Sequence, residues 1–446
     1  MTRRVVLLLL AVLFVAFAAY GSLVPLRFRE VGLSEAVERF ANTPLVPLPQ
    51  ASKSDFLTNV LLFVPIGFLL LGALAGRSRR AAVLLALPVA LIGGALSVAI
   101  EFGQIFVVGR TPSWNDVVAE SLGGTLGALL WLIAGSAVVA WIAGIFRSEF
   151  EGDRVYGILG AYVGVWVILA LLPLDFTVRL EELGEKFRAG RIVFEPFPKG
   201  WTLRDAGGTL LLAIPVGAFG VALSRRRQVP RPALAGLGVG LALSVAAEVV
   251  QVFSYSRTAD STDLLMNAAG VLLGVALAAR WSDSVTSAPH ASARVKVWPM
   301  VTLALWCVAL LVRHWSPFDF TTDTSMIRSR IPAMFAVPFH SYYRGFAPYV
   351  LVDVTTKLLM AVPVGALLQL MFLPRRRLWR CVMGAGIVAV SGLIFLALEV
   401  GQLMLPSRVP DQTDVYIGTL GAAIGVGIVW LITHRRPGPV AARPSG

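Results

Sequence analysis

Long apolar runs separated by short polar segments dominate the chain. Runs of about 17 to 28 residues are long enough to cross the hydrocarbon core of a bilayer as helices. Twelve such runs are present, which predicts twelve membrane-spanning helices. Their approximate limits are 5–24, 56–75, 81–107, 115–145, 155–172, 206–223, 232–254, 262–281, 297–313, 353–373, 379–405 and 413–433.

The first apolar run follows the basic sequence MTRR and has the form of a signal peptide. Its end, LVPLRF (23–28), recurs as LLPLDF (171–176) and WSPFDF (315–320). Because each of these segments closes the first helix of a repeated unit, we interpret the first run as a spanning helix.

A unit of four helices is repeated three times, with limits near 1–150, 151–295 and 296–446. In each unit a second-helix Asp precedes a Pro by 10 positions, and a third-helix Glu precedes a fourth-helix Asp by 15. The pairs are Asp55/Pro65, Asp205/Pro215 and Asp353/Pro363, and Glu101/Asp116, Glu248/Asp263 and Glu399/Asp414. Since each unit has an even number of spans, all three share one orientation. The fold class predicted is all-α: a polytopic bundle of about 12 helices in three parallel four-helix repeats.

The composition fits this class, with 57% hydrophobic and 15% charged residues. Its net charge of +13 is concentrated in the loops between the second and third helices. Their arginines are Arg77, Arg79 and Arg80; Arg225, Arg226, Arg227 and Arg231; and Arg375, Arg376, Arg377 and Arg380. Under the positive-inside rule these loops and both termini are cytoplasmic. The basic charge therefore indicates orientation and contact with membrane lipids, and we expect no nucleic-acid partner.

Motifs for cofactor chemistry are missing from the sequence. The two cysteines, Cys307 and Cys381, lie in apolar stretches without metal-ligand spacing, and the four histidines are scattered. No phosphate-binding loop, dinucleotide fingerprint or nucleophile elbow is present. We therefore expect no metal, no cofactor and no nucleotide.

Each unit places five polar side chains around the turn between its third and fourth helices and the start of its second. Glu and Gln, three residues apart, share a helix face, and the Arg that follows has a planar fork that can hold the Glu carboxylate bidentately. These ligand-binding candidates are Asp55, Glu101, Gln104, Arg110 and Asp116; Asp205, Glu248, Gln251, Arg257 and Asp263; and Asp353, Glu399, Gln402, Arg408 and Asp414.

The predicted helix limits put Glu101 about 10 Å below the extracytoplasmic end of its helix. A charged side chain at the membrane centre costs about 2.5–3.5 kcal/mol, so these acids are expected to face protein or water. Two interpretations remain open. The clusters are either structural latches of the turn between helices or sites that contact a ligand.

Other repeated features predict packing and interfacial segments. The fourth-helix glycines allow close helix approach, and the second-helix prolines shape kinks. The glycine pairs are Gly123/Gly127, Gly270/Gly274 and Gly421/Gly425. Amphipathic segments follow the first helix in two units, with apolar positions at Leu33, Val37 and Phe40 and at Leu180, Leu183 and Phe187.

The spacings D-x3-N-x5-P-x-G and E-x2-Q-x5-R-x5-D, which begin at Asp55 and Glu101, resemble the VanZ-like membrane domain, a family named for a protein of teicoplanin resistance. The resemblance covers nearly the whole chain in three copies. Asn59 of this pattern is replaced by Thr209 and Lys357, and a fourth-helix Asn267 by Glu120 and Gly418, so the copies have specialised. The resemblance implies a protein of the bacterial cytoplasmic (inner) membrane that affects glycopeptide susceptibility.

Three functions are compatible with these observations. In the first, the clusters bind or translocate an amphiphilic envelope ligand, either a lipid-linked precursor or a lipoglycopeptide, and contribute to antibiotic resistance. In the second, the chain is a membrane scaffold whose clusters are latches. In the third, paired carboxylates act as an intramembrane enzyme on an envelope lipid. No nucleophile accompanies these acids, so we favour a protein that is not an enzyme.

Overall fold

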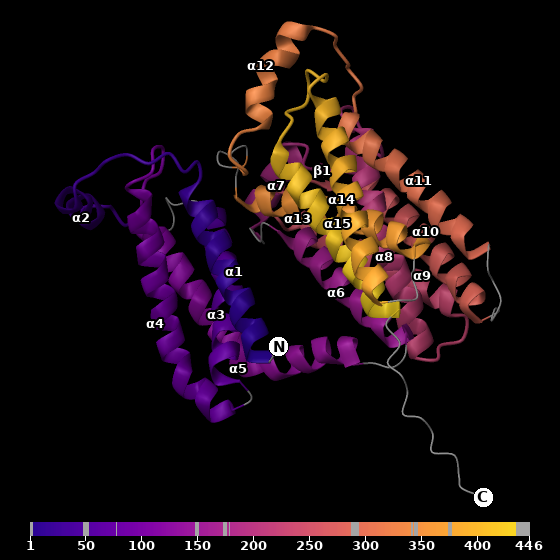
Figure 1. The fold of residues 1–446 in the computed structure, drawn as a ribbon, viewed down its shortest axis with the longest axis horizontal. Coiled ribbons are helices and arrows are strands. Elements are labelled where there is room, and N and C mark those ends of the chain that lie inside the picture. The colour runs from indigo at the N-terminus through magenta and orange to yellow at the C-terminus, as the bar shows by residue number, and fades with distance from the viewer. Residues whose placement is uncertain are drawn as a thin grey trace, which may run out of the picture.

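The computed structural model describes residues 3–47, 53–76, 78–147, 151–172, 176–177, 179–286, 294–339, 342, 347–372 and 377–433. Of the arginines in the basic loops, Arg77, Arg375 and Arg376 lie outside these residues. Within the described residues the fold is helical, with only one short pair of strands (Figure 1). This confirms the predicted all-α class.

Unit 1 contains four long helices and one short one. The long helices are α1 (Arg3–Leu23), α3 (Lys53–Ala75), α4 (Arg79–Gln104) and α5 (Trp114–Arg147), and the short amphipathic helix is α2 (Leu33–Ala41). At about 1.5 Å per residue, the 34 residues of α5 make it about 51 Å long, well beyond one bilayer core. Its C-terminal part extends from unit 1 toward the rest of the molecule (Figure 1).

Unit 2 repeats this order and adds two strands. Its elements are α6 (Glu151–Leu171), α7 (Leu180–Arg188), β1 (Ile192–Val193), α8 (Leu203–Arg226), α9 (Pro232–Val252), β2 (Ala259–Asp260) and α10 (Ser261–Thr286). The two strands pair in parallel and join the loop after α7 to the turn before α10. They were not predicted, because two residues are too few to show an alternating pattern.

Unit 3 has the same five-helix order. Its helices are α11 (Arg294–Trp315), α12 (Thr324–Met334), α13 (Ala347–Met371), α14 (Arg377–Gln402) and α15 (Gln412–Thr433). Among the described residues, eleven helices are long and apolar enough to cross a membrane. The twelfth predicted span, in α11, has a shorter apolar part, Pro299–Trp315.

The second and fourth helices of each unit pack backbone against backbone, as the glycines predicted. A Cβ built on Gly123 would lie 2.1 Å from the Val60 carbonyl oxygen, and one on Gly127 would lie 2.1 Å from that of Val64. A Cβ built on any of the equivalent glycines would lie 1.9 to 2.4 Å from a carbonyl oxygen; these are Gly270, Gly274, Gly421 and Gly425. Because real Cβ atoms do not approach so closely, only glycine permits this helix spacing.

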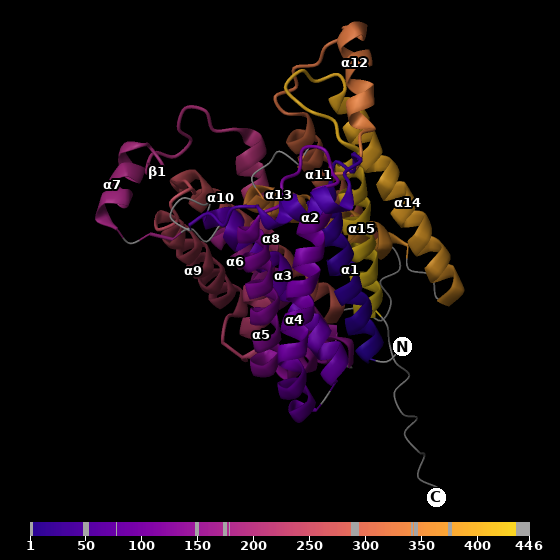
Figure 2. The same cartoon turned by 90° about the vertical axis from the view of Figure 1, so that its left-hand side faces the viewer.

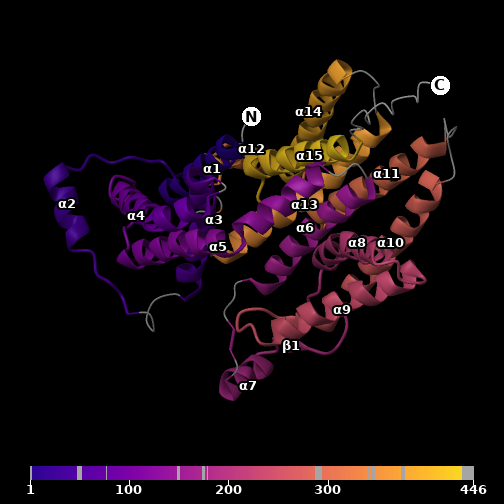
Figure 3. The same cartoon turned by 90° about the horizontal axis from the view of Figure 1, so that it is seen from below.

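Units 2 and 3 lie against each other, and unit 1 stands to one side of them (Figures 1 and 3). Helix α11 packs against α8, and α15 packs against α6. On unit 1, the Tyr20 hydroxyl donates to the Pro338 carbonyl oxygen of unit 3 at 2.7 Å. Helices α2, α7 and α12 lie toward the same end of the molecule (Figures 1 and 2). We call this the polar end, because the turns 105–113, 253–260 and 403–411 lie there.

The third helices end earlier than predicted, which changes the position of the glutamates. They end at Gln104, Val252 and Gln402, whereas the apolar pattern continued to 107, 254 and 405. Glu101 therefore lies in the last turn of its helix, and its predicted depth of about 10 Å was wrong. Several of the apolar residues that follow the helix ends are buried. Hydrophobicity alone therefore does not mark where the helix ends.

Candidate functional site

Each unit binds the segment after its first helix to the segment after its third. One backbone N–H of the former donates to a carbonyl oxygen of the latter at 2.7 to 2.8 Å. The three donor and acceptor pairs are Arg29/Phe106, Thr177/Phe253 and Thr321/Met404. The repeat thus extends to individual hydrogen bonds, and it fixes the three polar turns in equivalent places.

The arginine of each turn caps the first helix of its own unit. The last carbonyls of a helix have no partner within the helix, and a cation there also favours the helix dipole. In units 1 and 2 the guanidinium makes two such bonds of 2.7 to 2.9 Å. The bonds join Arg110 to Val24 and Gly21, Arg257 to Leu172 and Leu169, and Arg408 to Ser316.

The predicted bidentate pairing of arginine with glutamate is therefore wrong. No ion pair joins Arg110 to Glu101 within the described part of the chain, and the same holds for the equivalent pairs in units 2 and 3. Instead, the Glu carboxylate accepts from a backbone N–H twelve residues later, just before the fourth helix. The acceptor and donor pairs are Glu101/Ser113, Glu248/Asp260 and Glu399/Asp411.

Glutamate and glutamine meet as predicted in two of the units. The Gln104 Nε2 donates to Glu101 at 2.5 Å, and the Gln402 Nε2 donates to Glu399 at 2.9 Å. In unit 2 one oxygen of Glu248, Oε2, is buried without a hydrogen-bond partner among the described residues. Glu101 and Glu399 are each 1% exposed, so these two carboxylates face protein, as the cost of placing them in hydrocarbon requires.

A second cation caps the third helix, and the sequence pattern did not predict it. Lys186 of α7 donates to three carbonyl oxygens at the end of α9, at 2.6 to 2.9 Å. Arg330 of α12 makes the equivalent contacts with the end of α14, and Arg29 donates to the Ile105 carbonyl at 2.7 Å in unit 1. A basic residue on an amphipathic helix was the available signal, but its partner on another helix could not be read from spacing.

The aspartate of the fourth helix meets the variable residue of the second helix in every unit. Asp116 accepts from Asn59, and Asp263 accepts from the Thr209 hydroxyl at 3.0 Å. In unit 3 the partner is a cation, and it changes the chemistry of the site. Lys357 Nζ lies 2.7 Å from Asp414.

Lys357 also bridges to the start of its own helix. Its Nζ lies 2.7 Å from Asp353 and donates to the Tyr342 hydroxyl at 2.7 Å. That hydroxyl donates in turn to Asp353 at 2.8 Å. Burial and the two neighbouring carboxylates raise the pKa of Tyr342, so the phenol stays protonated. The second-helix acids of units 1 and 2 have different surroundings from Asp353. Asp205 accepts from the Thr202 hydroxyl at 2.6 Å, and Asp55 is exposed.

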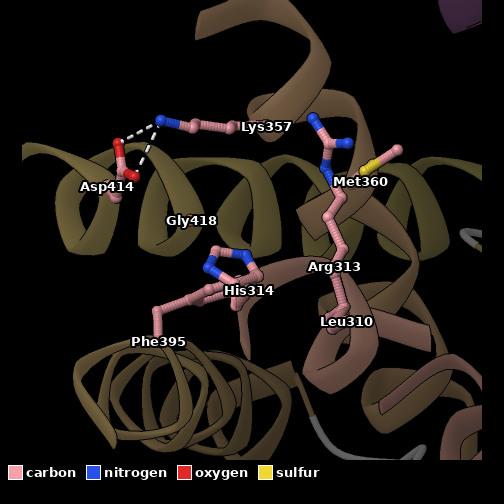
Figure 4. Close-up of a pocket in the computed structure, with 8 residues that line it drawn as sticks. All are labelled: Leu310, Arg313, His314, Lys357, Met360, Phe395, Asp414 and Gly418. Carbon is pink, nitrogen blue, oxygen red and sulfur yellow. Dashed lines mark hydrogen bonds and ion pairs between the residues drawn. The ribbon is translucent and has the colours of Figure 1, made fainter. Parts of the chain in front are cut away.

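A polar cavity of about 250 Å³ opens beside this network, between units 2 and 3. Its walls come from α8, α11, α13, α15, the C-terminal end of α14 and the turn before α15. The lining residues are Arg204, Arg313, His314, Lys357, Gln402, Ser407, Arg408, Val409 and Asp414. A narrower adjoining pocket extends toward Phe395 and Met360, and Figure 4 shows Arg313 and Lys357 entering it from two helices.

Of the candidates in unit 3, the structure brings Gln402, Arg408 and Asp414 to this cavity. Glu399 and Asp353 are not among the lining residues. Each contacts a residue that is, since Glu399 lies 3.4 Å from His314 and Asp353 lies 2.7 Å from Lys357. Arg204, Arg313 and His314 were not predicted as site residues. Arg313 and His314 end an apolar helix and Arg204 adjoins Asp205, but only the packing of α8 against α11 brings them together.

The fold and the repeated polar turns define a polytopic helical membrane protein of three tandem units, with a polar cavity between units 2 and 3. The sequence profile of the family described as VanZ/LLP1 matches residues 5–135, 159–282 and 300–433. The chain belongs to this family, in three copies. No curated protein and no solved structure matches it.

Proposed function

We propose that this protein binds an amphiphilic envelope ligand whose polar headgroup enters the cavity between units 2 and 3. The ligand classes are a lipid-linked envelope precursor or a lipoglycopeptide, and binding the latter contributes to glycopeptide tolerance. The observation that carries the proposal is the cavity itself, which is lined largely by charged and polar side chains next to helices apolar enough to span a membrane.

The volume of the cavity limits what it can take. Pockets that enclose a whole drug-sized molecule measure about 300–1,000 Å³, and this one is smaller, at about 250 Å³. A headgroup therefore fits inside, while an acyl chain remains outside along the helices. A membrane amphiphile has this division of polar and apolar parts.

The three clusters contribute differently to this function. In units 1 and 2 the arginine makes two carbonyl bonds to its own unit, and the aspartate bonds to a neutral residue. These contacts support the latch interpretation there. In unit 3, Lys357 replaces the neutral residue, and Arg408 lies at a cavity shared with unit 2. We therefore assign ligand contact to unit 3.

A steric block tests the proposal without removing any hydrogen bond. Val409 lines the cavity and is 70% exposed, so Val409→Trp should fill its mouth. Thr258 is the equivalent exposed residue of unit 2, and Thr258→Trp is the matched control. Full-length protein in lipid nanodiscs would be exposed to a photo-crosslinkable lipid-linked precursor and, separately, to a labelled lipoglycopeptide.

Val409→Trp should abolish capture of the bound probe, while Thr258→Trp should retain it, at equal protein abundance. Cells that produce Val409→Trp should also lose any lipoglycopeptide tolerance that the wild type confers. Capture that persists in Val409→Trp would refute headgroup binding in the cavity.

A scaffold is the second candidate, and the satisfied latches of units 1 and 2 favour it. A scaffold needs its helices assembled, and it needs no open cavity. Two results together would support the scaffold. Val409→Trp would leave cellular function unchanged, and Lys186→Met, which loosens α7 from α9, would abolish it.

A further inference from the structure

We propose that the cavity between units 2 and 3 is an anion site that takes a phosphoryl group, held by Arg204, Arg313 and Arg408. This inference rests on the proposed function, because it names the chemistry of the headgroup that enters. The three arginines come from three parts of the chain: the start of α8, the end of α11 and the turn before α15. They line one cavity.

Two of these guanidinium groups retain unused donors. The Nε of Arg204 and the Nε of Arg408 are buried, and neither has a hydrogen-bond partner among the described residues. The equivalent turn arginine of unit 2 differs, since the Nε of Arg257 donates to the Leu172 carbonyl at 2.9 Å. A buried charged donor without an acceptor is unfavourable, so these donors favour a ligand that accepts from them.

Arg313 is directed across the boundary between the units. Its Nη1 lies 3.5 Å from the Arg204 carbonyl oxygen, a long contact. A Cβ built on Gly208 of α8 would lie 2.9 Å from the same nitrogen, so the guanidinium passes over α8 where that helix has no side chain. The positive charge of Arg313, on α11, therefore lies next to Arg204 of α8.

The carboxylates nearby are already engaged. Asp353 and Asp414 share Lys357, and Glu399 pairs with His314. Asp205 accepts from Thr202 and Asp319 from Ser407. In the described part of the chain, no ion pair neutralises the three arginines.

The arginines therefore repel one another. Burial and then the charge of Arg204 lower the pKa of Arg408, while Asp205 and Asp319 act in the opposite direction. Lys357 and Asp414 cancel, so the three arginines give the lining residues a formal charge of +3, with His314 left out of the count. A bound anion offsets this repulsion, and a neutral headgroup does not.

The number and directions of the arginines favour a phosphoryl group over a carboxylate. A guanidinium fork can hold either group bidentately. A planar carboxylate has two oxygens and one charge, whereas a terminal phosphate has three free oxygens and close to two negative charges at pH 7. The three guanidinium groups, from three segments of the chain, can each bind one free phosphate oxygen, and their combined positive charge matches the larger charge of the phosphate.

The test compares headgroups on one alkyl chain. Full-length protein in nanodiscs of a zwitterionic lipid would be titrated with decyl phosphate, decanoate and decyl maltoside, and also with inorganic pyrophosphate. We expect decyl phosphate to bind most tightly, and its affinity to fall as salt is raised. Arg204→Gln should weaken its binding at least about tenfold, since a charged hydrogen bond contributes roughly that factor.

Arg204→Gln should fold, because the Nε of Arg204 has no hydrogen-bond partner among the described residues. Arg188→Gln is the matched control, since it removes one exposed charge from α7 at the polar end, outside the cavity. This control should bind decyl phosphate as the wild type does. A melting temperature of Arg204→Gln equal to that of the control would separate lost binding from lost folding.

The outcomes separate this inference from the proposed function. Binding of decyl maltoside as tight as decyl phosphate, insensitive to Arg204→Gln, would overturn the anion site and leave headgroup binding standing. Pyrophosphate binding that depends on Arg204, with none of the three amphiphiles bound, would support the anion site and contradict the amphiphile proposal. Absence of binding by every probe would overturn both.

Discussion

Replacement of Lys357 by methionine tests the polar network of unit 3 most directly. Lys357 Nζ lies 2.7 Å from both Asp353 and Asp414. Methionine keeps a side chain of similar length and removes the charge. The variant therefore leaves two carboxylates on either side of an apolar group, while most packing is retained.

The cost follows from the burial of the three side chains. Lys357 is 18% exposed, Asp414 11% and Asp353 31%. Removing one partner of a buried ion pair costs about 3–5 kcal/mol. Because Asp353 has partial access to solvent, we expect the lower end, about 3 kcal/mol, which is roughly a 100-fold change in the unfolding equilibrium.

The free energy of unfolding would be measured by steric trapping in bicelles. Lys199→Met, at an exposed position, is the control and should change it by less than about 0.5 kcal/mol. The double variant Lys357→Met/Asp414→Asn should recover at least half of the loss, because only one unpaired carboxylate remains. A change in Lys357→Met no larger than that of the control would show that solvent already screens these charges, and our account of the network would fail.

Three further results are expected. Gly425→Ala should destabilise unit 3 by about 1–3 kcal/mol through overpacking, because its Cβ would lie 2.0 Å from a carbonyl oxygen of α13. Gly427→Ala is the control and should cause no such loss, because a Cβ there would meet no atom within 4 Å. The free energies of unfolding of the two variants would be compared. Lys186→Met should raise hydrogen exchange at the end of α9 by leaving three carbonyls without a donor. Hydrogen bonds from Ser325 lower the pKa of Asp323 below its usual 3.8, so its cap on α12 is intact above that pH and is lost as pH falls through the lowered value. Exchange of α12 should therefore rise in acid, and less so in Asp323→Asn.

The three units show one motif used in two ways. The Glu, Arg and second cation bind backbone groups at helix ends in all three units, although the Nε of Arg408 has no partner among the described residues. The second-helix position varies as Asn59, Thr209 and Lys357, and only the lysine introduces a charge that pairs with the fourth-helix Asp. Specialisation of unit 3 therefore begins at a position that the sequence pattern had already marked as divergent.

The sequence by itself determined the membrane class, the tandem repeat and the close packing of glycine-rich helices. These follow from local properties, namely run length, fixed spacing and the missing Cβ of residues such as Gly127. The burial of Glu101 and Glu399 could also be predicted, since an unpaired acid is too costly in hydrocarbon.

Only the tertiary structure decided which partners the polar residues take. Arg110 binds one carbonyl in the last turn of α1 and one just after it, more than 80 positions away in the chain, although a carboxylate lies nine residues before it. Spacing identifies neighbours along one helix, but the ends of other helices offer unsatisfied carbonyls that compete for a guanidinium. The cavity of unit 3 was hidden for the same reason, because Arg204, Arg313 and Arg408 meet only where α8 and α11 pack together.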